Sequence, residues 1–519
     1  MKKLIKTLGL VATVAILTSC GPNPSISEES SNSSHDSSTT IAPEVGEGYH
    51  RVDKLSFYAQ DVKPTYSASQ GVLNVLIIPL DLPTGGFNDF ERWSNQRHQQ
   101  LEKEFFGKQN ESTGGWNSLK SYYETASFGK TEIQGFVADI YHEKDNKYSL
   151  YSIQNDPTQI DLLHAEYKRA TEWVLDHHSD TDWTQFDLNN DGCFDAIHFI
   201  TNAGQLNNQW NSPLWPHMAY TGFQGTHERP MANVYSNSCL GQMHDGPRTQ
   251  IHEQGHMLGL EDYYDYSYPN VADYIGGADM QDMNMFDWNS YSKMAVGWAN
   301  PYVIDGTSDV ATVTMSAASL NGDCLIIPAD YSTWNGSAYD EYFLIELFSP
   351  FNNNEVDWNR YNTYSGSNLG EYGVRMYHVD SRLWACESSR KVNQGHELKN
   401  LEDIQLAIKD DLSIDIGPNN SYDGTTYAAP CPTSWLDYKL LSIIQRGKVD
   451  TFGSDPKSLL SKGDLFRKGD VFKYEEYSHF LSKFGKTRPT TDKGEVFPYE
   501  ITFKDMSKRE VTIEVKKVK

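Results

Sequence analysis

The chain contains the segment Ile251-His-Glu-Gln-Gly-His-Met-Leu-Gly-Leu-Glu-Asp262, and this segment is the most informative part of its sequence. His252 and His256 are four residues apart, so on a helix both imidazoles project from one face and can bind a single Zn²⁺. Glu253 follows the first histidine and is suited to deprotonate a zinc-bound water, because zinc lowers the pKa of that water towards neutrality. The segment therefore predicts a helix that carries a hydrolytic zinc site.

A catalytic zinc ion needs a third protein ligand while one position stays open. Gly259 allows the helix to stop and the chain to turn, which returns Asp262 towards the metal. Glu261, one residue earlier, and Asp265, further along the loop, are the alternative third ligands. We expect Asp262 to be the ligand, because its spacing from the glycine suits the turn.

The sequence before this segment alternates between strands and helices. Val72–Leu80 is a continuous apolar run, as in a strand buried on both faces. Asp161–His177 has the apolar spacing of an amphipathic helix, and Ala196–Thr201 is another short apolar strand. This alternation is typical of an α/β layered domain. After about residue 301, short strands such as Tyr342–Phe348 and polar turns predominate, so we expect an α+β protein whose C-terminal region is mostly β.

The zinc segment is part of a longer pattern, His252-Glu-x-x-His256-x-x-Gly259-x-x-Asp262-x-Tyr264. Other matching segments, in order, are Val72–Leu80 with Asp81, Leu119–Lys130, Asp187–Asp195, Trp215–His217, Gly277–Met280, Asn289–Met294 with Gly297 and Trp298, Tyr342–Glu346 and Gly373–Asp380. Together they resemble the immune inhibitor A family of bacterial zinc metallopeptidases over roughly residues 70–385. The resemblance implies a metzincin-like catalytic domain, zinc-dependent endopeptidase activity and export from the cell.

Two positions depart from the pattern of that family. Relatives often read Asp-Met-Met where this chain has Asp279-Met-Gln281, and they often carry a histidine after the aspartate where this chain has Asp287-Trp288. Neither position is one of the three expected zinc ligands. The expected activity therefore stands.

Methionine and tyrosine residues near the zinc segment are candidates for supporting roles. Met280, Met283 and Met285 are candidates for the methionine turn that packs beneath the zinc in metzincin-like folds, and Met280 matches the family pattern. Core filling is the alternative role for each of them. Tyr264 and Tyr291 are candidates for stabilising an oxyanion through the phenol, and packing is again the alternative.

A calcium site is predicted at Asp187-Leu-Asn-Asn-Asp-Gly-Cys-Phe-Asp195. Asp187, Asn189, Asp191 and Asp195 place side-chain oxygens at positions 1, 3, 5 and 9, with a glycine at position 6, as in the first three-quarters of an EF-hand-type loop for Ca²⁺. Position 12 is a histidine, so another carboxylate would have to come from elsewhere. A polar turn is the alternative interpretation.

The N-terminus predicts export and a lipid anchor. Basic residues from Lys2 to Lys6 precede the apolar stretch Leu8–Leu17, which is too short for a stable transmembrane helix but suits a signal peptide. The stretch ends in Leu17-Thr-Ser-Cys20, which resembles a bacterial lipoprotein cleavage box, so we expect Cys20 to carry the lipid. The alternative is an ordinary secretory signal with an incidental cysteine.

We expect four parts: a signal peptide at 1–19, a Ser-rich tether at 20–45, a zinc metallopeptidase catalytic domain at 46–301 and a β-rich region at 302–519. Residues 41–70 are a short pro-segment or further linker. Five cysteines follow Cys20, an odd number, so at least one thiol is unpaired in a monomer.

The net charge limits the classes of partner. Asp and Glu number 70 and Lys and Arg 44, which gives a net charge of −26 and argues against nucleic acid as a partner. We expect a monomeric, surface-anchored zinc endopeptidase on the extracellular face of a membrane, whose partners are protein or peptide substrates. The alternative is a catalytically weak or inactive surface lipoprotein that binds protein or glycan through its β-rich half.

Overall fold

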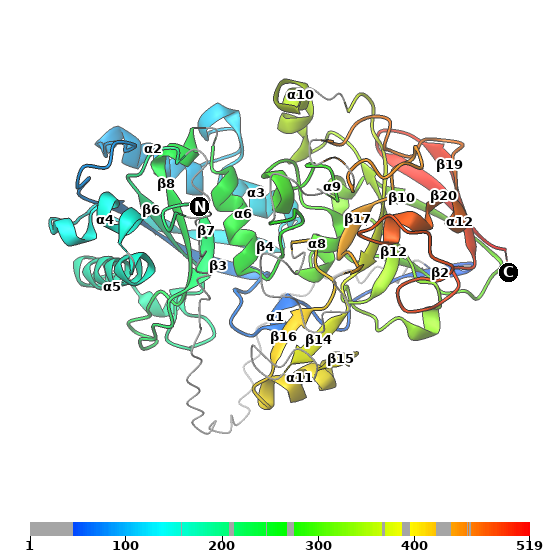
Figure 1. Cartoon of the computed structure of the whole chain (residues 1–519), viewed down its shortest axis with the longest axis horizontal. Coiled ribbons are helices and arrows are strands. Elements are labelled where there is room, and N and C mark those ends of the chain that lie inside the picture. Colours follow the sequence, from blue (N-terminus) through cyan, green and yellow to red (C-terminus); the bar gives the residue numbers. More distant parts are fainter. Residues whose placement is uncertain are drawn as a thin grey trace, which may run out of the picture.

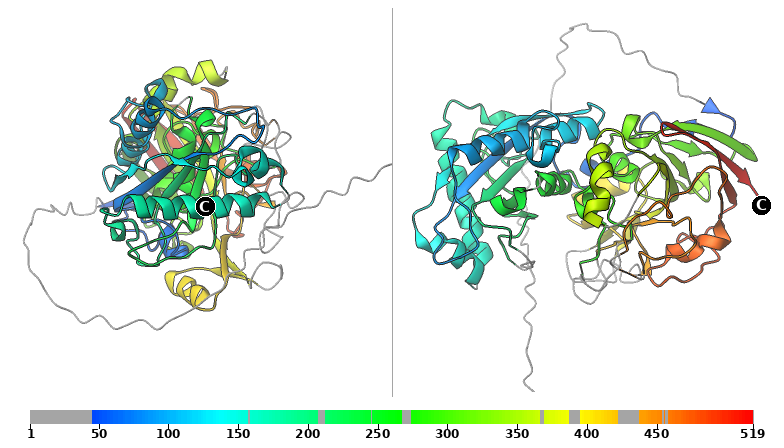
Figure 2. Two further views of the ribbon diagram at one scale, coloured as in Figure 1. Left: turned by 90° about the vertical axis from the view of Figure 1, so that its left-hand side faces the viewer. Right: turned by 90° about the horizontal axis from the view of Figure 1, so that it is seen from above.

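The computed structural model describes residues 45–518, apart from 157, 207–211, 245, 267–273, 366–368, 387–394, 422–436, 454 and 456–457. The expected signal peptide, Cys20 and the tether up to residue 44 lie outside the described residues. The described chain forms two lobes, with helix α6 (Arg248–Met257) between them (Figures 1 and 2). Helices and several sheets occur together, which confirms the expected α+β class.

The first lobe is built on a sheet with the strand order β4-β3-β6-β8-β7. Strands β4, β3, β6 and β8 are parallel, whereas β7 is antiparallel to β8 and forms an edge of the sheet. A short strand, β5, also pairs with β3. The bounds are β3 Gly71–Asp81, β4 Thr131–Val137, β5 Tyr141–His142, β6 Ile197–Thr201, β7 His217–Tyr220 and β8 Val234–Cys239.

The central strand β3 divides two apolar cores, as its continuous apolar run predicts. Because successive side chains of a strand point to opposite faces, Val75 and Ile77 enter one core and Leu76 and Ile78 enter the other. Helices α2, α3 and α6 contribute to the first core, and α5 contributes to the second on the outer face of the lobe (Figure 1). The helices of this lobe before α6 are α2 Asn95–Phe106, α3 Leu119–Ala126, α4 Leu150–Asn155 and α5 Gln159–His177, and α1 Ala59–Val62 lies on the connection between the lobes.

The described residues of the second lobe form three sheets, with strand orders β1-β2-β9-β11-β12-β13-β17, β10-β20-β19-β18 and β15-β14-β16. The first two share one apolar core, to which β12 contributes Phe343 and Ile345. The opposite face of β12 sends Tyr342 and Leu344 into the core that also contains α6. The lobes are therefore joined through one continuous apolar core. The strands are β1 Val45–Gly46, β2 Tyr49–Arg51, β9 Tyr302–Ile304, β10 Val310–Ser316, β11 Leu325–Ile327, β12 Glu341–Phe348, β13 Gly373–Asp380, β14 Leu383–Cys386, β15 His396–Leu398, β16 Ser413–Ile416, β17 Leu441–Ile443, β18 Val471–Lys473, β19 Tyr499–Met506 and β20 Glu510–Lys517.

Six further helices follow α6 in the described residues. Helices α7 and α8 lie in the loop region that follows the zinc segment, and α10 and α11 interrupt the β-rich region. That region is nevertheless mostly β in its regular structure, as its short strand patterns predict. The helices are α7 Met280–Met283, α8 Ser290–Ala295, α9 Ala318–Asn321, α10 Asn354–Ser365, α11 Leu401–Lys409 and α12 Tyr474–Tyr477.

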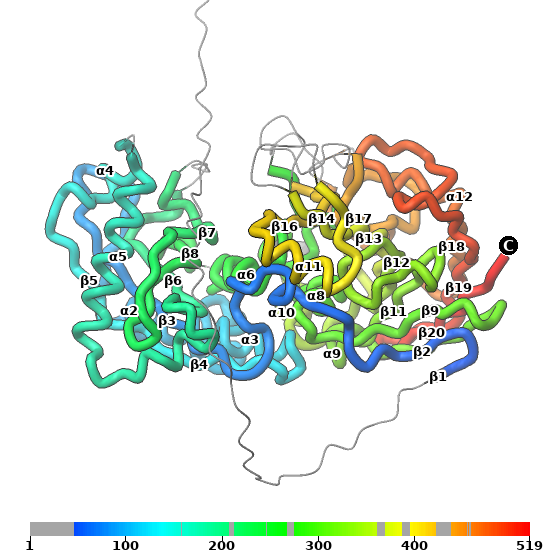
Figure 3. The backbone as a smooth tube through the Cα atoms, turned by 90° about the horizontal axis from the view of Figure 1, so that it is seen from below, coloured from blue at the N-terminus to red at the C-terminus, as the bar shows by residue number. Residues whose placement is uncertain are grey.

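The N-terminal part of the described chain connects the two lobes. Strand β2 pairs with β9, so residues 49–51 belong to the large sheet of the second lobe. The chain then runs past α1 to β3 in the first lobe, as the blue tube in Figure 3 shows. The expected boundaries at residues 46 and 301 remain predictions; residue 46 lies in β1 and residue 301 directly precedes β9, two strands of the same sheet.

The cysteines follow the expectation that at least one thiol is unpaired. Cys193, Cys239 and Cys324 are free and buried, and Cys386 is disulfide-bonded. Within the described part of the chain, no helix has the length and apolar character needed to cross a membrane.

The shared core predicts that the two lobes unfold together. Leu344→Ala removes a fully buried side chain from that core, so it should lower the free energy of unfolding by about 2–5 kcal/mol. Urea denaturation followed by fluorescence and circular dichroism should show one coincident transition. Leu406→Ala is the matched control, because Leu406 is 54% exposed, and it should change stability by at most about 0.5 kcal/mol. Two separate transitions would contradict a shared core.

Candidate metal centre

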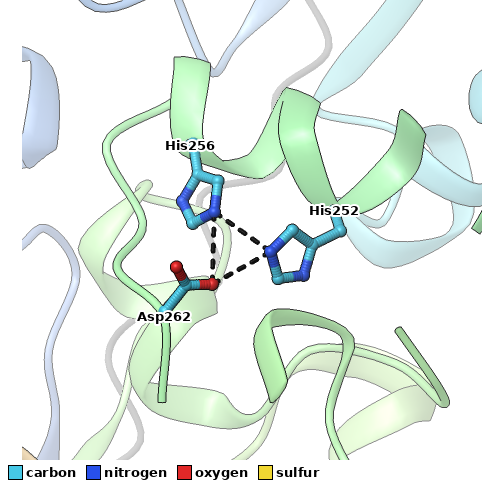
Figure 4. A group of neighbouring side chains, drawn as sticks. All are labelled: His252, His256 and Asp262. Atoms are coloured by element: carbon cyan, nitrogen blue, oxygen red, sulfur yellow. Dashed lines mark hydrogen bonds and ion pairs between the residues drawn. The ribbon is translucent and has the colours of Figure 1, made fainter. Parts of the chain in front are cut away.

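Helix α6 and the turn that follows it bring the expected metal ligands together. His252 and His256 lie one turn apart on the helix and face the chain that follows it (Figure 4). Gly259 has a φ of 95°, in the left-handed region that favours glycine. A Cβ at this position would also lie 2.6 Å from the ring of Tyr66. Glycine is therefore required twice over at the turn, which returns Asp262 to the histidines.

Three side-chain atoms converge at this point. His252 Nε2 lies 3.0 Å from His256 Nε2 and 3.0 Å from Asp262 Oδ1, and the third side of the triangle, from His256 Nε2 to Asp262 Oδ1, is 3.3 Å (Figure 4). Glu261 and Asp265, the alternative third ligands, are not part of this group in the described structure. Burial raises the pKa of Glu261, and the charge of Lys63 offsets only part of this rise.

The other ring nitrogens determine where the imidazole protons are. His252 Nδ1 donates to the carbonyl oxygen of Met280 at 2.8 Å, and His256 Nδ1 donates to that of Leu260 at 2.7 Å. Because a carbonyl only accepts, both neutral rings carry their proton on Nδ1 and direct an Nε2 lone pair inwards. Asp262 Oδ1 is also directed inwards and lies 3.0 and 3.3 Å from the two Nε2 atoms. Three electron-pair donors facing one another require a cation or a proton between them.

The pKa values agree with this need for positive charge. Burial disfavours a charged imidazole, but the charge of Asp262 outweighs burial and raises the pKa of His256 to about 10. Burial likewise acts to raise the pKa of Asp262, but the charge of His256 and hydrogen bonds from both histidines hold it well below its usual range. Without a metal the group retains a proton, which a bound Zn²⁺ would displace.

Two tyrosines complete the surroundings of Asp262. Tyr266 Oη donates to Asp262 Oδ2 at 2.7 Å and so fixes the carboxylate with Oδ1 towards the histidines. The ring of Tyr264 stacks against His252, with centroids 6.4 Å apart. Tyr264, an expected candidate, lies beside the centre, whereas sequence reasoning missed Tyr266. No signal in the sequence separates Tyr266 from the other tyrosines of this aromatic-rich chain.

Glu253 lies beside the ligands and is 6% exposed. Burial raises its pKa, whereas the charges of His252 and His256 and a hydrogen bond from the Met218 amide act in the opposite direction. Met218 belongs to β7, the edge strand, which packs against α6. The acidic side chain suited to proton transfer therefore lies between the metal centre and a sheet edge.

The methionine and tyrosine candidates in the loop after the centre differ in their burial and contacts. Met280 is fully buried, and its carbonyl oxygen is the acceptor for the His252 ring. Met285 is 9% exposed and Met283 is 55% exposed, so Met283 does not pack beneath the centre. Tyr291 is buried and packs edge-to-face against Tyr263 at 6.3 Å.

The second lobe holds this loop in place. Glu346 of β12 accepts hydrogen bonds from the amide of Ser290 at 2.8 Å and from its hydroxyl at 2.6 Å. Arg375 of β13 pairs with Glu346 at 2.5 Å and donates to the carbonyl oxygen of Ala278 at 2.7 Å. All these groups are buried. The loop that orients His252 is therefore fastened at both ends to the sheet of the second lobe.

The predicted calcium loop forms a compact turn in the first lobe. Asp187 Oδ1 and Asn189 Oδ1 accept from the amide of Asp191, at 3.0 and 3.1 Å, and Asp195 Oδ2 accepts from the amide of Leu188 at 2.8 Å. Burial, with the charges of Asp187 and Asp191, raises the pKa of Asp195 to about 6. These carboxylates are not gathered as a three-ligand group within the described residues. Calcium binding here remains a prediction.

His217, a candidate for the substrate cleft, is held by its own lobe. Its Nδ1 lies 2.6 Å from the carbonyl oxygen of Trp215, and its Nε2 lies 3.4 Å from Tyr235 Oη. These contacts support a structural role for this histidine.

Comparison of the chain with family models and with curated proteins finds no match to either. The resemblance to the immune inhibitor A family therefore rests on the sequence segments alone.

Zinc affinity should rise with pH. Because His256 keeps its proton up to about pH 10 in the metal-free protein, zinc binding releases that proton, and affinity should increase about tenfold per pH unit below this value. The proton also stabilises the metal-free fold: this contribution is complete below the ordinary pKa of 6.5 and is lost as pH rises through about 10. Zinc titration in chelator-buffered solutions at several pH values measures the slope. A flat dependence would contradict proton displacement.

Tyr266→Phe should weaken zinc binding, because it removes the hydrogen bond that orients Asp262. Partners of this kind typically contribute 10–100-fold in metal affinity, so we expect a loss of about that size. Competition with a zinc chelator provides the measurement. Tyr331→Phe, which removes a hydroxyl from a surface tyrosine of the second lobe, is the matched control and should leave zinc affinity unchanged. An unchanged affinity in Tyr266→Phe would exclude this role.

Proposed function

We propose that the chain is a zinc-dependent endopeptidase with a metzincin-like first lobe. In this proposal His252, His256 and Asp262 hold the zinc ion, and Glu253 is the general base. The observation that carries the proposal is the meeting of two Nε2 atoms and one carboxylate oxygen within 3.0–3.3 Å, while both Nδ1 atoms bond to backbone carbonyl groups. Two imidazoles and a carboxylate are ligands that zinc prefers in catalytic sites.

Bound zinc supplies Lewis-acid chemistry, which polarises the scissile carbonyl and acidifies a water molecule. The chain moves the protons. The Glu253 carboxylate accepts a proton from the attacking water and delivers it to the amine that leaves when the peptide bond breaks. Burial raises the pKa of Glu253, which favours its uptake of a proton from the attacking water.

The edge strand β7 supports a polypeptide substrate. Its outer edge pairs with no other strand in the described residues, so an extended peptide can add to it through backbone hydrogen bonds. This strand packs against α6, the helix that carries Glu253. A peptide on this edge therefore runs beside the general base.

We also propose that the enzyme works at the cell surface, anchored by a lipid on Cys20. This part of the proposal is supported by the signal sequence and cleavage box alone. Its substrates would then be extracellular proteins.

Glu253→Gln tests the proposal. The variant should bind zinc as the wild type does but lose about 10²–10⁴-fold of casein hydrolysis, because the amide accepts no proton. Zinc content by mass spectrometry and casein turnover with and without a chelator provide the measurements. Glu132→Gln, the same change at an exposed residue of β4, should keep full activity.

Unchanged turnover in Glu253→Gln would remove this residue from the mechanism. Zinc binding without any casein turnover in the wild type would favour the alternative of an inactive binding lipoprotein.

A further inference from the structure

A second cluster of possible metal ligands lies in the other lobe. Glu341 begins β12, His378 lies in β13, and Asp492 lies in the irregular segment 482–498 that precedes β19. Their ligand atoms all lie within 4.8 Å of one another. The residues are far apart in sequence, and none belongs to the first centre on α6.

The spacing within this cluster suits one ion. His378 Nε2 lies 2.9 Å from Glu341 Oε1 and 3.9 Å from Asp492 Oδ2. In a tetrahedral zinc site with metal–ligand distances of about 2.0–2.2 Å, two ligand atoms lie about 3.3–3.6 Å from each other. This separation falls between the two distances in the cluster. The side chains are 0% exposed for His378 and Asp492 and 3% exposed for Glu341, so the cluster is closed to solvent.

Neighbouring groups orient both carboxylates towards the centre of the cluster. Glu341 accepts from the amides of Asp492 at 2.6 Å and Lys493 at 2.5 Å, one at each oxygen. Asp492 Oδ1 accepts from Arg488 at 2.6 Å. Asp492 Oδ2 is fully buried, has no hydrogen-bond partner among the described residues and lies on the side of His378. An unsatisfied buried carboxylate oxygen is costly, so this atom favours a cation bound by the cluster.

Protonation of the histidine accounts for only part of this arrangement. A single proton on His378 Nε2 forms one good hydrogen bond, to Glu341 at 2.9 Å, and leaves Asp492 Oδ2 at 3.9 Å, which is beyond hydrogen-bond distance. Nearby cations already have partners: Arg382 bonds Asp380 through two nitrogens, at 2.8 and 2.7 Å. A divalent ion bound by all three ligands satisfies both carboxylates together.

We propose that Glu341, His378 and Asp492 form a second, structural zinc site that fastens segment 482–498 to the sheet of the second lobe. One imidazole with two carboxylates suits zinc better than calcium, which prefers oxygen ligands alone. The segment contains no helix or strand beyond residue 481 until β19 begins at Tyr499. A metal that crosslinks it to β12 and β13 stabilises the native state by mass action.

Zinc stoichiometry tests the second site. The full chain, stripped by a chelator and dialysed against Zn²⁺, should bind about two zinc ions, counted by mass spectrometry. Asp492→Asn and His378→Gln, which approximate the original shapes, should each bind one ion and keep casein turnover per folded molecule. Asp139→Asn is the matched control, because that side chain is 79% exposed, and it should bind two.

Asp262→Asn separates this proposal from the proposed function and leaves the second cluster intact. This variant should lose casein turnover but retain one zinc ion, and zinc should still raise its melting temperature. The double variant with Asp262→Asn and Asp492→Asn should bind no zinc, and zinc should no longer raise its melting temperature. If Asp262→Asn binds no zinc, or if Asp492→Asn and His378→Gln bind as much zinc as the wild type, the second site does not exist. The catalytic proposal would be unaffected by either result.

Discussion

Two hydrogen bonds to backbone carbonyl groups govern the metal centre. They run from Nδ1 of His252 to Met280 and from Nδ1 of His256 to Leu260, and they turn both Nε2 lone pairs towards Asp262. Neither acceptor is a side chain, so both depend on the path of the backbone. The Leu260 carbonyl is set by the helix and its glycine turn. The Met280 carbonyl belongs to a loop that needs support from elsewhere.

That support comes from the second lobe, and it depends on the core that the two lobes share. Glu346 and Arg375 hold Ser290 and Ala278, on either side of Met280, through buried charged hydrogen bonds. Such bonds are strong only when water is excluded, and the apolar core common to both lobes excludes it. The β-rich lobe therefore contributes to the geometry of the first centre, although none of its described residues belongs to that ligand group.

The sequence predicts the local parts of this architecture well. A period of four places His252 and His256 on one helix face, and the glycine turn favours Asp262 over its neighbours. The apolar run of β3 likewise predicts a strand buried on both faces. Contacts between distant segments leave no such pattern, so the pairing of β2 with β9 and the cluster at Glu341 come only from the structure. The Glu346–Arg375 pair is of this second kind, whereas Tyr266 lies only four residues from Asp262 and is missed because nothing in the sequence separates it from the other tyrosines.

The two departures from the family pattern lie where helix α6 meets the loop that follows it. Trp288 Nε1 donates to Gln281 Oε1 at 3.1 Å, so the unexpected residues bond to each other. A Cβ at Gly255 would lie 2.3 Å from that same oxygen, so helix and loop meet closely only because position 255 is glycine. The Gln281 amide lies 3.5 Å from His256 Nδ1, beside the shorter bond from that nitrogen to its carbonyl acceptor. The substituted pair therefore packs against the outer side of the His256 ring and leaves Nε2 untouched, so the departures are compatible with the proposed metal centre.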